Sequence, residues 1–222
     1  ATHGTVYVQG PQQSGKTECV RSMLYMAMRN MPDAEFLVCG LLAKLDANWA
    51  DFRAYENCLG MVHKPGDIQA ALQWAASSMN QGRNKPLIVV IDDLINILGQ
   101  ADIEGALDEI LFAGRGLKTY MLVTSQGGGS ADTIGSKRAR FGQTCKVMYK
   151  PTSSAAGSAM SGRKGSETGL AMLSGRAGDA VLDERGDITR IATPRLSMMT
   201  MAGRGRVGGV PWTPSPSPRP HD

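Results

Sequence analysis

The fold is decided by one stretch of sequence, Gly10-Pro11-Gln12-Gln13-Ser14-Gly15-Lys16-Thr17. It fits the pattern G-x-x-x-x-G-K-[ST], and it joins an alternating β-branched segment, residues 5–9, to residues 16–31, whose apolar side chains recur at helical spacing. Glycines here let backbone N–H groups and the helix N-terminus bind phosphate, Lys16 would neutralise phosphate oxygens, and Thr17 would ligate Mg²⁺. All residues of the stretch are therefore predicted to bind ATP, unless it is a plain turn.

A pair of carboxylates follows the apolar segment Leu87-Ile88-Val89-Val90-Ile91, which is typical of a parallel strand buried on both faces. Such a strand would bring Asp92 and Asp93 to the edge of the sheet beside the phosphates. We expect Asp92 to hold Mg²⁺ through a water and Asp93 to act as the general base on the attacking water. An acidic residue at a strand end is also a common helix N-cap, and this alternative stays open for Asp93.

A third polar group ends the next apolar segment, Tyr120-Met121-Leu122-Val123-Thr124, which leads into Ser125-Gln126. In a parallel sheet its side chains emerge at the same edge as Asp92. We expect Gln126 to sense the γ-phosphate or to orient the attacking water, and the alternative is a polar turn after a strand.

The remaining pattern alternates strands with helices. Further strands are predicted at residues 36–39, 145–149, 180–182 and 188–191, and helices at 49–55, 67–79, 103–111 and 153–160. This alternation predicts β-α-β units and an α/β fold with a mainly parallel central sheet flanked by helices. The prolines after Pro211 predict an extended tail or linker.

Composition excludes several classes of protein. The four cysteines form no C-x-x-C motif, which argues against a structural zinc site, and they lie in apolar segments, as reduced cytoplasmic thiols do. No apolar run approaches the roughly 18–20 residues of a membrane span, so we expect a cytoplasmic fragment, although a longer protein that contains it could be membrane-anchored. A net charge of +4 permits a polyanionic partner without identifying one.

The order of motifs resembles that of FtsK/HerA-type DNA-pumping ATPases. Beyond the phosphate loop and Asp92-Asp93, the resemblance rests on Gly114-Arg115-Gly116 before the strand that ends in Ser125-Gln126, on Gly175-Arg176-Ala177-Gly178-Asp179, and on the strand-like segment from Ile188 to Leu196. It implies a RecA-like P-loop NTPase with a C-terminal β-hairpin. Residues 1–196 would form the motor domain, and residues 197–222 a Gly/Pro-rich tail.

The resemblance also implies a function. Family members are Mg-dependent ATPases that form homo-oligomers, commonly hexameric rings, and move double-stranded DNA through a central channel. Each active site lies at a subunit boundary and receives an arginine from the neighbour. Arg115 matches that position, and the alternative is a surface arginine after a helix.

DNA contacts are expected from two basic loops. Lys137, Arg138 and Arg140 lie in one of them, and Arg163 and Lys164 in the other. Lysine and arginine among small residues suit phosphate contacts that do not depend on base sequence. Charge runs of this length are also common in solvated loops.

One segment departs from the family pattern. The strand after the first helix typically leads into an Asp-Pro-Lys segment in FtsK-like translocases, whereas this chain has Cys39-Gly40-Leu41-Leu42-Ala43-Lys44. A conjugative, secretion-system or mobile-element relative is therefore equally compatible with the sequence. Two other functions remain open: a secretion ATPase that moves protein, and a nucleotide-gated binding module that does not hydrolyse ATP.

Overall fold

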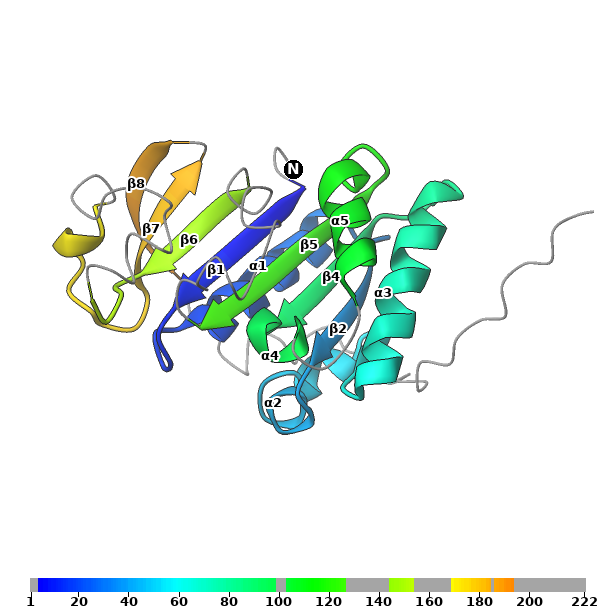
Figure 1. Cartoon of the computed structure of the whole chain (residues 1–222), viewed down its shortest axis with the longest axis horizontal. Coiled ribbons are helices and arrows are strands. Elements are labelled where there is room, and N and C mark those ends of the chain that lie inside the picture. Colours follow the sequence, from blue (N-terminus) through cyan, green and yellow to red (C-terminus); the bar gives the residue numbers. More distant parts are fainter. Residues whose placement is uncertain (1–3, 99–102, 127–143, 154–168, 185, 194–222) are drawn as a thin grey trace, which may run out of the picture.

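Eight strands form one sheet in the order β3-β2-β4-β5-β1-β6-β7-β8 in the computed structural model (Figure 1). The structure describes residues 4–98, 103–126, 144–153, 169–184 and 186–193. The strands are β1 Thr5–Gly10, β2 Glu35–Gly40, β3 Cys58–Val62, β4 Leu87–Asp92, β5 Thr119–Gln126, β6 Cys145–Tyr149, β7 Asp179–Glu184 and β8 Asp187–Ala192. Strands β1 to β6 pair in parallel, and β7 and β8 continue the sheet as an antiparallel hairpin.

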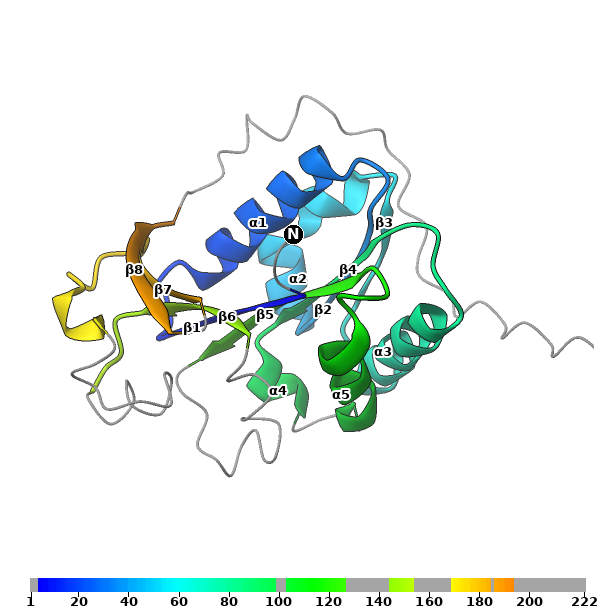
Figure 2. The same cartoon turned by 90° about the horizontal axis from the view of Figure 1, so that it is seen from above.

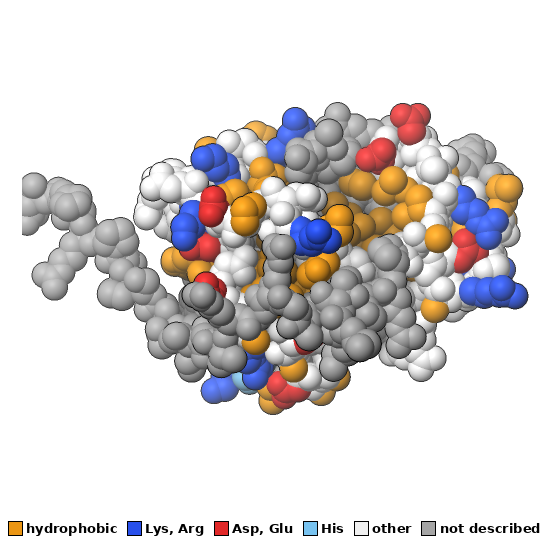
Figure 3. All heavy atoms as spheres, turned by 180° about the vertical axis from the view of Figure 1, so that it is seen from behind, with side chains coloured by type: hydrophobic (Ala, Val, Ile, Leu, Met, Phe, Trp, Pro, Cys, Tyr) orange, Lys and Arg blue, Asp and Glu red, His pale blue; other side chains and the backbone are white. Residues whose placement is uncertain are grey.

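Helices cover both faces of the parallel part of the sheet (Figure 2). One face carries α1 and α2, and the other carries α3, α4 and α5. The helices are α1 Lys16–Asn30, α2 Leu42–Asn48, α3 Pro65–Asn80, α4 Leu94–Leu98 and α5 Glu104–Ala113, with 3₁₀ turns at Ala50–Ala54 and Leu170–Met172. Hydrophobic side chains gather on the face of the molecule that α1 covers (Figure 3). On α1 itself, Met26 is 50% exposed. Among the described residues, no helix has the length and apolar character that crossing a bilayer requires.

Strand β4 explains why the sheet is buried on both sides. Successive side chains of a strand point to opposite faces of the sheet. Because helices cover both faces, all residues of β4 are buried. Val89 and Ile91 pack with α3 and α5, whereas Ile88 and Val90 pack with α1. A continuous apolar strand between two helical layers confirms the predicted α/β fold with a mainly parallel sheet and a C-terminal hairpin.

One local prediction was wrong. Residues 49–55 were expected to form a helix, but the helix is α2, Leu42–Asn48, and a 3₁₀ turn follows it at Ala50–Ala54. The reason is that Leu, Ala and Lys in residues 42–45 favour helix, while Trp49 and Phe52 are fully buried anchors rather than one face of a longer helix. Strand β3 and the short helix α4 were not predicted, and the helix expected at 153–160 lies almost entirely outside the described residues.

Candidate functional site

The phosphate loop connects β1 to α1 and is held in a conformation that only small residues permit. Gly15 has φ 103°, in the left-handed region that favours glycine, and it directly precedes the first residue of α1. A Cβ on Gly10 would lie 2.7 Å from Cβ of Tyr149. Lys16 is 8% exposed, and its Nζ donates a hydrogen bond to the Pro11 carbonyl at 2.5 Å. The loop is therefore closed around its own lysine.

The strand register brings the predicted polar groups to this loop. Gly10 at the end of β1 pairs with Gln126 at the end of β5, and Gly40 at the end of β2 pairs with Asp92 at the end of β4. Because these strands are parallel, their carboxyl ends share one edge of the sheet. Gln12 Nε2 donates to Gln126 Oε1 at 3.2 Å, so the loop and β5 are in direct contact.

Asp92 lies beside Thr17. Thr17 Oγ1 donates to Asp92 Oδ1 at 3.4 Å. The carboxylate is 1% exposed and accepts two shorter hydrogen bonds, from Thr124 Oγ1 at 2.7 Å and from Trp49 Nε1 at 3.0 Å. These buried donors fix the orientation of Asp92 towards the helix that carries Thr17.

Asp93 is also 1% exposed, and one of its oxygens collects several donors. Oδ2 accepts hydrogen bonds from Gln126 Nε2 at 2.6 Å and Asn96 Nδ2 at 2.7 Å, and it forms an ion pair with Lys44 Nζ. Oδ1 is buried and has no hydrogen-bond partner within the described part of the chain. Among the described residues, the carboxylate contacts side chains and not the N–H groups of α4, so the N-cap alternative finds no support.

Burial and the neighbouring charges together lower the pKa of Lys16 from 10.5 to about 8. Burial is the largest cause, the negative charge of Asp93 opposes it, and the smaller effects of Lys44 and Asp92 lower and raise the pKa respectively. Two ammonium groups and two carboxylates therefore interact within one small region. An anion that binds both ammonium groups would relieve their mutual repulsion.

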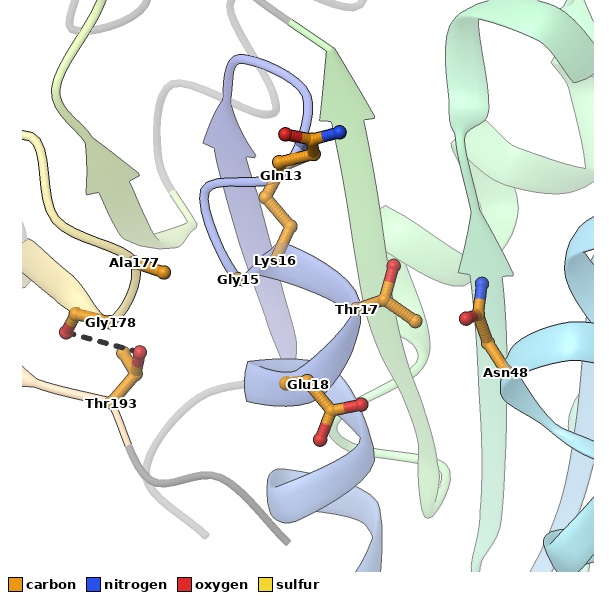
Figure 4. A pocket seen from close by; sticks show the side chains of 9 residues that line it. All are labelled: Gln13, Gly15, Lys16, Thr17, Glu18, Asn48, Ala177, Gly178 and Thr193. Atoms are coloured by element: carbon orange, nitrogen blue, oxygen red, sulfur yellow. Dashed lines mark hydrogen bonds between the residues drawn. The ribbon is translucent and has the colours of Figure 1, made fainter.

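A cavity of about 440 Å³ adjoins the loop (Figure 4). The phosphate loop and the start of α1 line its centre, and the hairpin and α2 line its two sides, through Gln13, Gly15, Lys16, Thr17, Glu18, Asn48, Ala177, Gly178 and Thr193. Its size and its position beside the loop suit a nucleotide whose phosphates reach the loop.

The hairpin side of this cavity is tied to the loop by hydrogen bonds. Gly178 N donates to the Ser14 carbonyl at 3.1 Å, and Tyr149 Oη donates to the Gly15 carbonyl at 3.3 Å. Thr193 Oγ1 donates to the Gly178 carbonyl at 3.2 Å and lies 2.8 Å from Tyr149 Oη. The C-terminal hairpin therefore contributes to the site.

Arg115 lies at the opposite end of the strands, near the amino ends of β1 and β5. It follows α5 and precedes the amino end of β5, and a Cβ on Gly4, just before β1, would lie 2.7 Å from its Cβ. At about 3.3 Å per residue, the length of β5 separates it from its own phosphate loop. The guanidinium therefore does not reach the phosphate loop of its own chain.

The expected DNA contacts cannot be placed. Lys137, Arg138, Arg140, Arg163 and Lys164 lie outside the described residues, as does the expected tail at 197–222.

The residues at the loop fit a Mg²⁺ ion that is shared with phosphates. Thr17 and Asp92 present a hydroxyl and a carboxylate side by side, which are the hard oxygen donors that Mg²⁺ prefers. Ser14 Oγ and Asp93 Oδ1 are buried and have no hydrogen-bond partner among the residues that the structure describes. Across the described ranges, no three His, Cys, Asp or Glu side chains group into a metal site of their own, so the phosphates would complete the coordination. When bound, Mg²⁺ would neutralise charge on the phosphate oxygens.

Comparison with solved structures finds the same fold in several ATPases. The pCW3 conjugation coupling protein TcpA, solved with ATPγS, matches with a TM-score of 0.73 at 11% identity over 89% of this chain and 62% of its own. The cytoplasmic domain of the Thermomonospora curvata type VII secretion ATPase EccC matches with a TM-score of 0.66 at 14% identity, over 92% of this chain and 28% of its own. The genome packaging NTPase B204 of Sulfolobus turreted icosahedral virus 2, solved with ATPγS, matches with a TM-score of 0.63 at 12% identity, over 87% of this chain and 98% of its own.

The chain has the fold of FtsK/HerA-type P-loop ATPases. This confirms, for the fold, the resemblance that the motifs indicated. The chain spans less than two thirds of TcpA and of EccC. No protein-family model matches it, and no curated protein matches it by sequence.

Sequence reasoning missed several residues of the site. Lys44, Trp49 and Asn96 contact the two aspartates, and Gly178 and Thr193 line the cavity. A signal existed for Lys44, because it stands in the segment that departs from the Asp-Pro-Lys pattern. Trp49 had none, since a buried tryptophan in a short helical segment predicts only core.

Proposed function

We propose that this chain is the motor core of an ATP-hydrolysing ring that moves double-stranded DNA. The observation that carries the hydrolytic part is the meeting of Lys16, Asp92, Asp93 and Gln126 at one edge of the sheet, beside a cavity of about 440 Å³. In this proposal Lys16 binds phosphate oxygens, Asp93 takes the proton of the attacking water, and Gln126 orients that water.

The position of Arg115 supports an assembly of several copies of this chain. A cation at the far edge of the sheet can complete an active site only in a neighbouring subunit, where it would stabilise charge that develops on the transferred phosphoryl group. Two exposed apolar side chains flank it, Phe112 at 84% and Leu117 at 38% exposure, and these suit a contact with a second copy of the chain. A hexameric ring is the arrangement that we propose.

Two observations support DNA as the cargo. Two of the structural neighbours are described as a conjugation coupling protein and a genome packaging NTPase. The chain also carries a positive net charge, +4, with basic clusters at residues 137–140 and 163–164. A second candidate cargo is protein, which is supported by the likeness to a type VII secretion ATPase.

The test is ATP turnover measured against protein concentration, with and without duplex DNA. We expect turnover to rise steeply with concentration, and DNA of any sequence to stimulate it less as salt is raised. Lys16→Ala, which removes the phosphate-binding ammonium group, is the control for contaminating ATPase and should have lost nucleotide binding. Stimulation by an acidic partner protein but not by DNA would favour secretion, and ATP binding without turnover at any concentration would indicate a binding module.

A further inference from the structure

Lys44 is a cation of the site that the proposed hydrolytic machinery does not use. It lies in the first turns of α2, just after the carboxyl end of β2, and β2 pairs with β4, which carries Asp92. Its side chain is 32% exposed, whereas that of its partner Asp93 is 1% exposed. The ammonium group therefore lies between the solvent and the buried carboxylate of the candidate general base.

Asp93 does not depend on Lys44 for its hydrogen bonding. Gln126 and Asn96 donate to the same oxygen, Oδ2, at 2.6 and 2.7 Å. Loss of the lysine would leave this oxygen with two amide donors, so the carboxylate would not be left buried without partners. The ion pair can open at a lower cost than an ordinary buried pair.

Lys44 and Lys16 are two cations that both interact with Asp93. The two positive charges are near enough to disfavour each other, and Lys16 is turned back onto the carbonyl of Pro11. The loop side of the site also reaches Asp93 through Gln12 and Gln126, whose amides are hydrogen-bonded at 3.2 Å. A terminal phosphate placed beyond Lys16 would meet Lys44, Gln126 and Asp93 on its far side.

We propose that Lys44 binds the terminal phosphate of a nucleoside triphosphate, and that Asp93 holds its ammonium group in place until that phosphate arrives. This inference rests on the proposed function. A diphosphate is too short to reach Lys44, so the lysine selects triphosphate over diphosphate.

The test compares the affinities of ATPγS and ADP for the whole chain and for Lys44→Met. A charge-assisted hydrogen bond is worth roughly a 10- to 100-fold change in affinity, so the variant should lose about that factor for ATPγS and less than about threefold for ADP. Lys44→Arg keeps the charge and should recover part of the preference. Lys85→Met is the matched control. Lys85 pairs with Glu35 at the amino ends of the strands, away from the site, and its side chain is 59% exposed.

The outcomes distinguish failure of the role proposed for Lys44 from failure of the proposed function. If Lys44→Met leaves the ratio of the two affinities unchanged, or lowers both affinities equally, the role of Lys44 is refuted while the proposed function stands. If the wild-type chain binds neither nucleotide, the proposed function itself fails. Lys44→Gln, which can still donate a hydrogen bond but carries no charge, gives the same ratio should the methionine variant fail to fold.

Discussion

Asp93, the candidate general base, is held in a strained backbone conformation. Its φ is 73°, a left-handed value that residues with a Cβ seldom adopt. The backbone N–H donates to Thr124 Oγ1 at 2.8 Å, and the same hydroxyl donates to Asp92 Oδ1. Strain of this kind persists where the surroundings fix the backbone, and Thr124 does so for both carboxylates at once.

Asp93→Asn is expected to separate nucleotide binding from hydrolysis. Asparagine tolerates the left-handed conformation, and its carbonyl oxygen can still accept from Gln126 and Asn96, so the fold and ATP binding should persist. Turnover should fall by about 10²- to 10⁴-fold, because the amide cannot take a proton from water. Steady-state turnover and ATPγS affinity are the measurements. Asp46→Asn, at an exposed carboxylate on α2, should change neither, and undiminished turnover in Asp93→Asn would assign the base elsewhere.

At the scale of elements, hydrogen bonds on two sides hold the loop that leads into the hairpin β7–β8. Asp179 accepts hydrogen bonds from Arg190 at 2.9 and 3.0 Å and from Ser174, and these contacts, led by that with Arg190, hold the pKa of its carboxyl well below the usual range. On the other side, Gly178 bonds to Ser14 in the phosphate loop. The loop between Ser174 and Asp179 is thereby fixed as a wall of the cavity.

Thr193→Val should weaken nucleotide binding without unfolding the chain. Valine keeps the shape of threonine but removes the hydroxyl that contacts Gly178 and Tyr149, so the hairpin would lose part of its attachment to the loop. We expect a roughly threefold to tenfold loss of ATPγS affinity, the value of about one hydrogen bond. Thr189→Val, at an exposed position on β8, the strand that Thr193 directly follows, is the control. An unchanged affinity in Thr193→Val would mean that the hairpin does not shape the site.

Elements were predictable where one period dominated the sequence. The apolar run of β4 and the helical spacing of α1 predicted their bounds to within about a residue, and the phosphate loop between strand and helix predicted the position of the site. Strand β3 was not predicted, because Gly60 interrupts a strand of only five residues. The contacts of Trp49 and Lys44 with the aspartates depend on how α2 packs over β2 and β4, and no local pattern contains that information.

At the scale of the whole molecule, the buried thiols link stability to pH. All four cysteines are free and buried. Burial raises the pKa of Cys39 from 9.0 to about 12 and those of Cys19, Cys58 and Cys145 to about 11. Above about pH 9 the unfolded chain therefore binds fewer protons than the native chain, and the free energy of unfolding should fall as pH rises towards 11.

Urea denaturation at pH 8 and pH 10 measures this slope. Cys39→Ala removes one such proton and should make the fall shallower, by up to about 1.4 kcal/mol per pH unit. Equal slopes in the two proteins would contradict the assignment. A thiol reagent at pH 8 should react slowly with the native protein and should reach all four thiols after unfolding.

The arrangement of the whole molecule separates the phosphate loop from Arg115 by the length of the sheet, and this makes the proposed ring testable by mixing. Arg115→Ala subunits keep Asp93 but lack the arginine, and Asp93→Asn subunits supply the arginine but lack the base. Each variant alone should be inactive. In an equal mixture about one quarter of the boundaries would combine an intact Asp93 with an intact Arg115 from the neighbour, so turnover should return to a fraction of the wild-type rate. Turnover should peak near equal proportions of the two variants. A mixture as inactive as its components, at concentrations where the wild type is active, would exclude Arg115 as a residue that acts across the boundary.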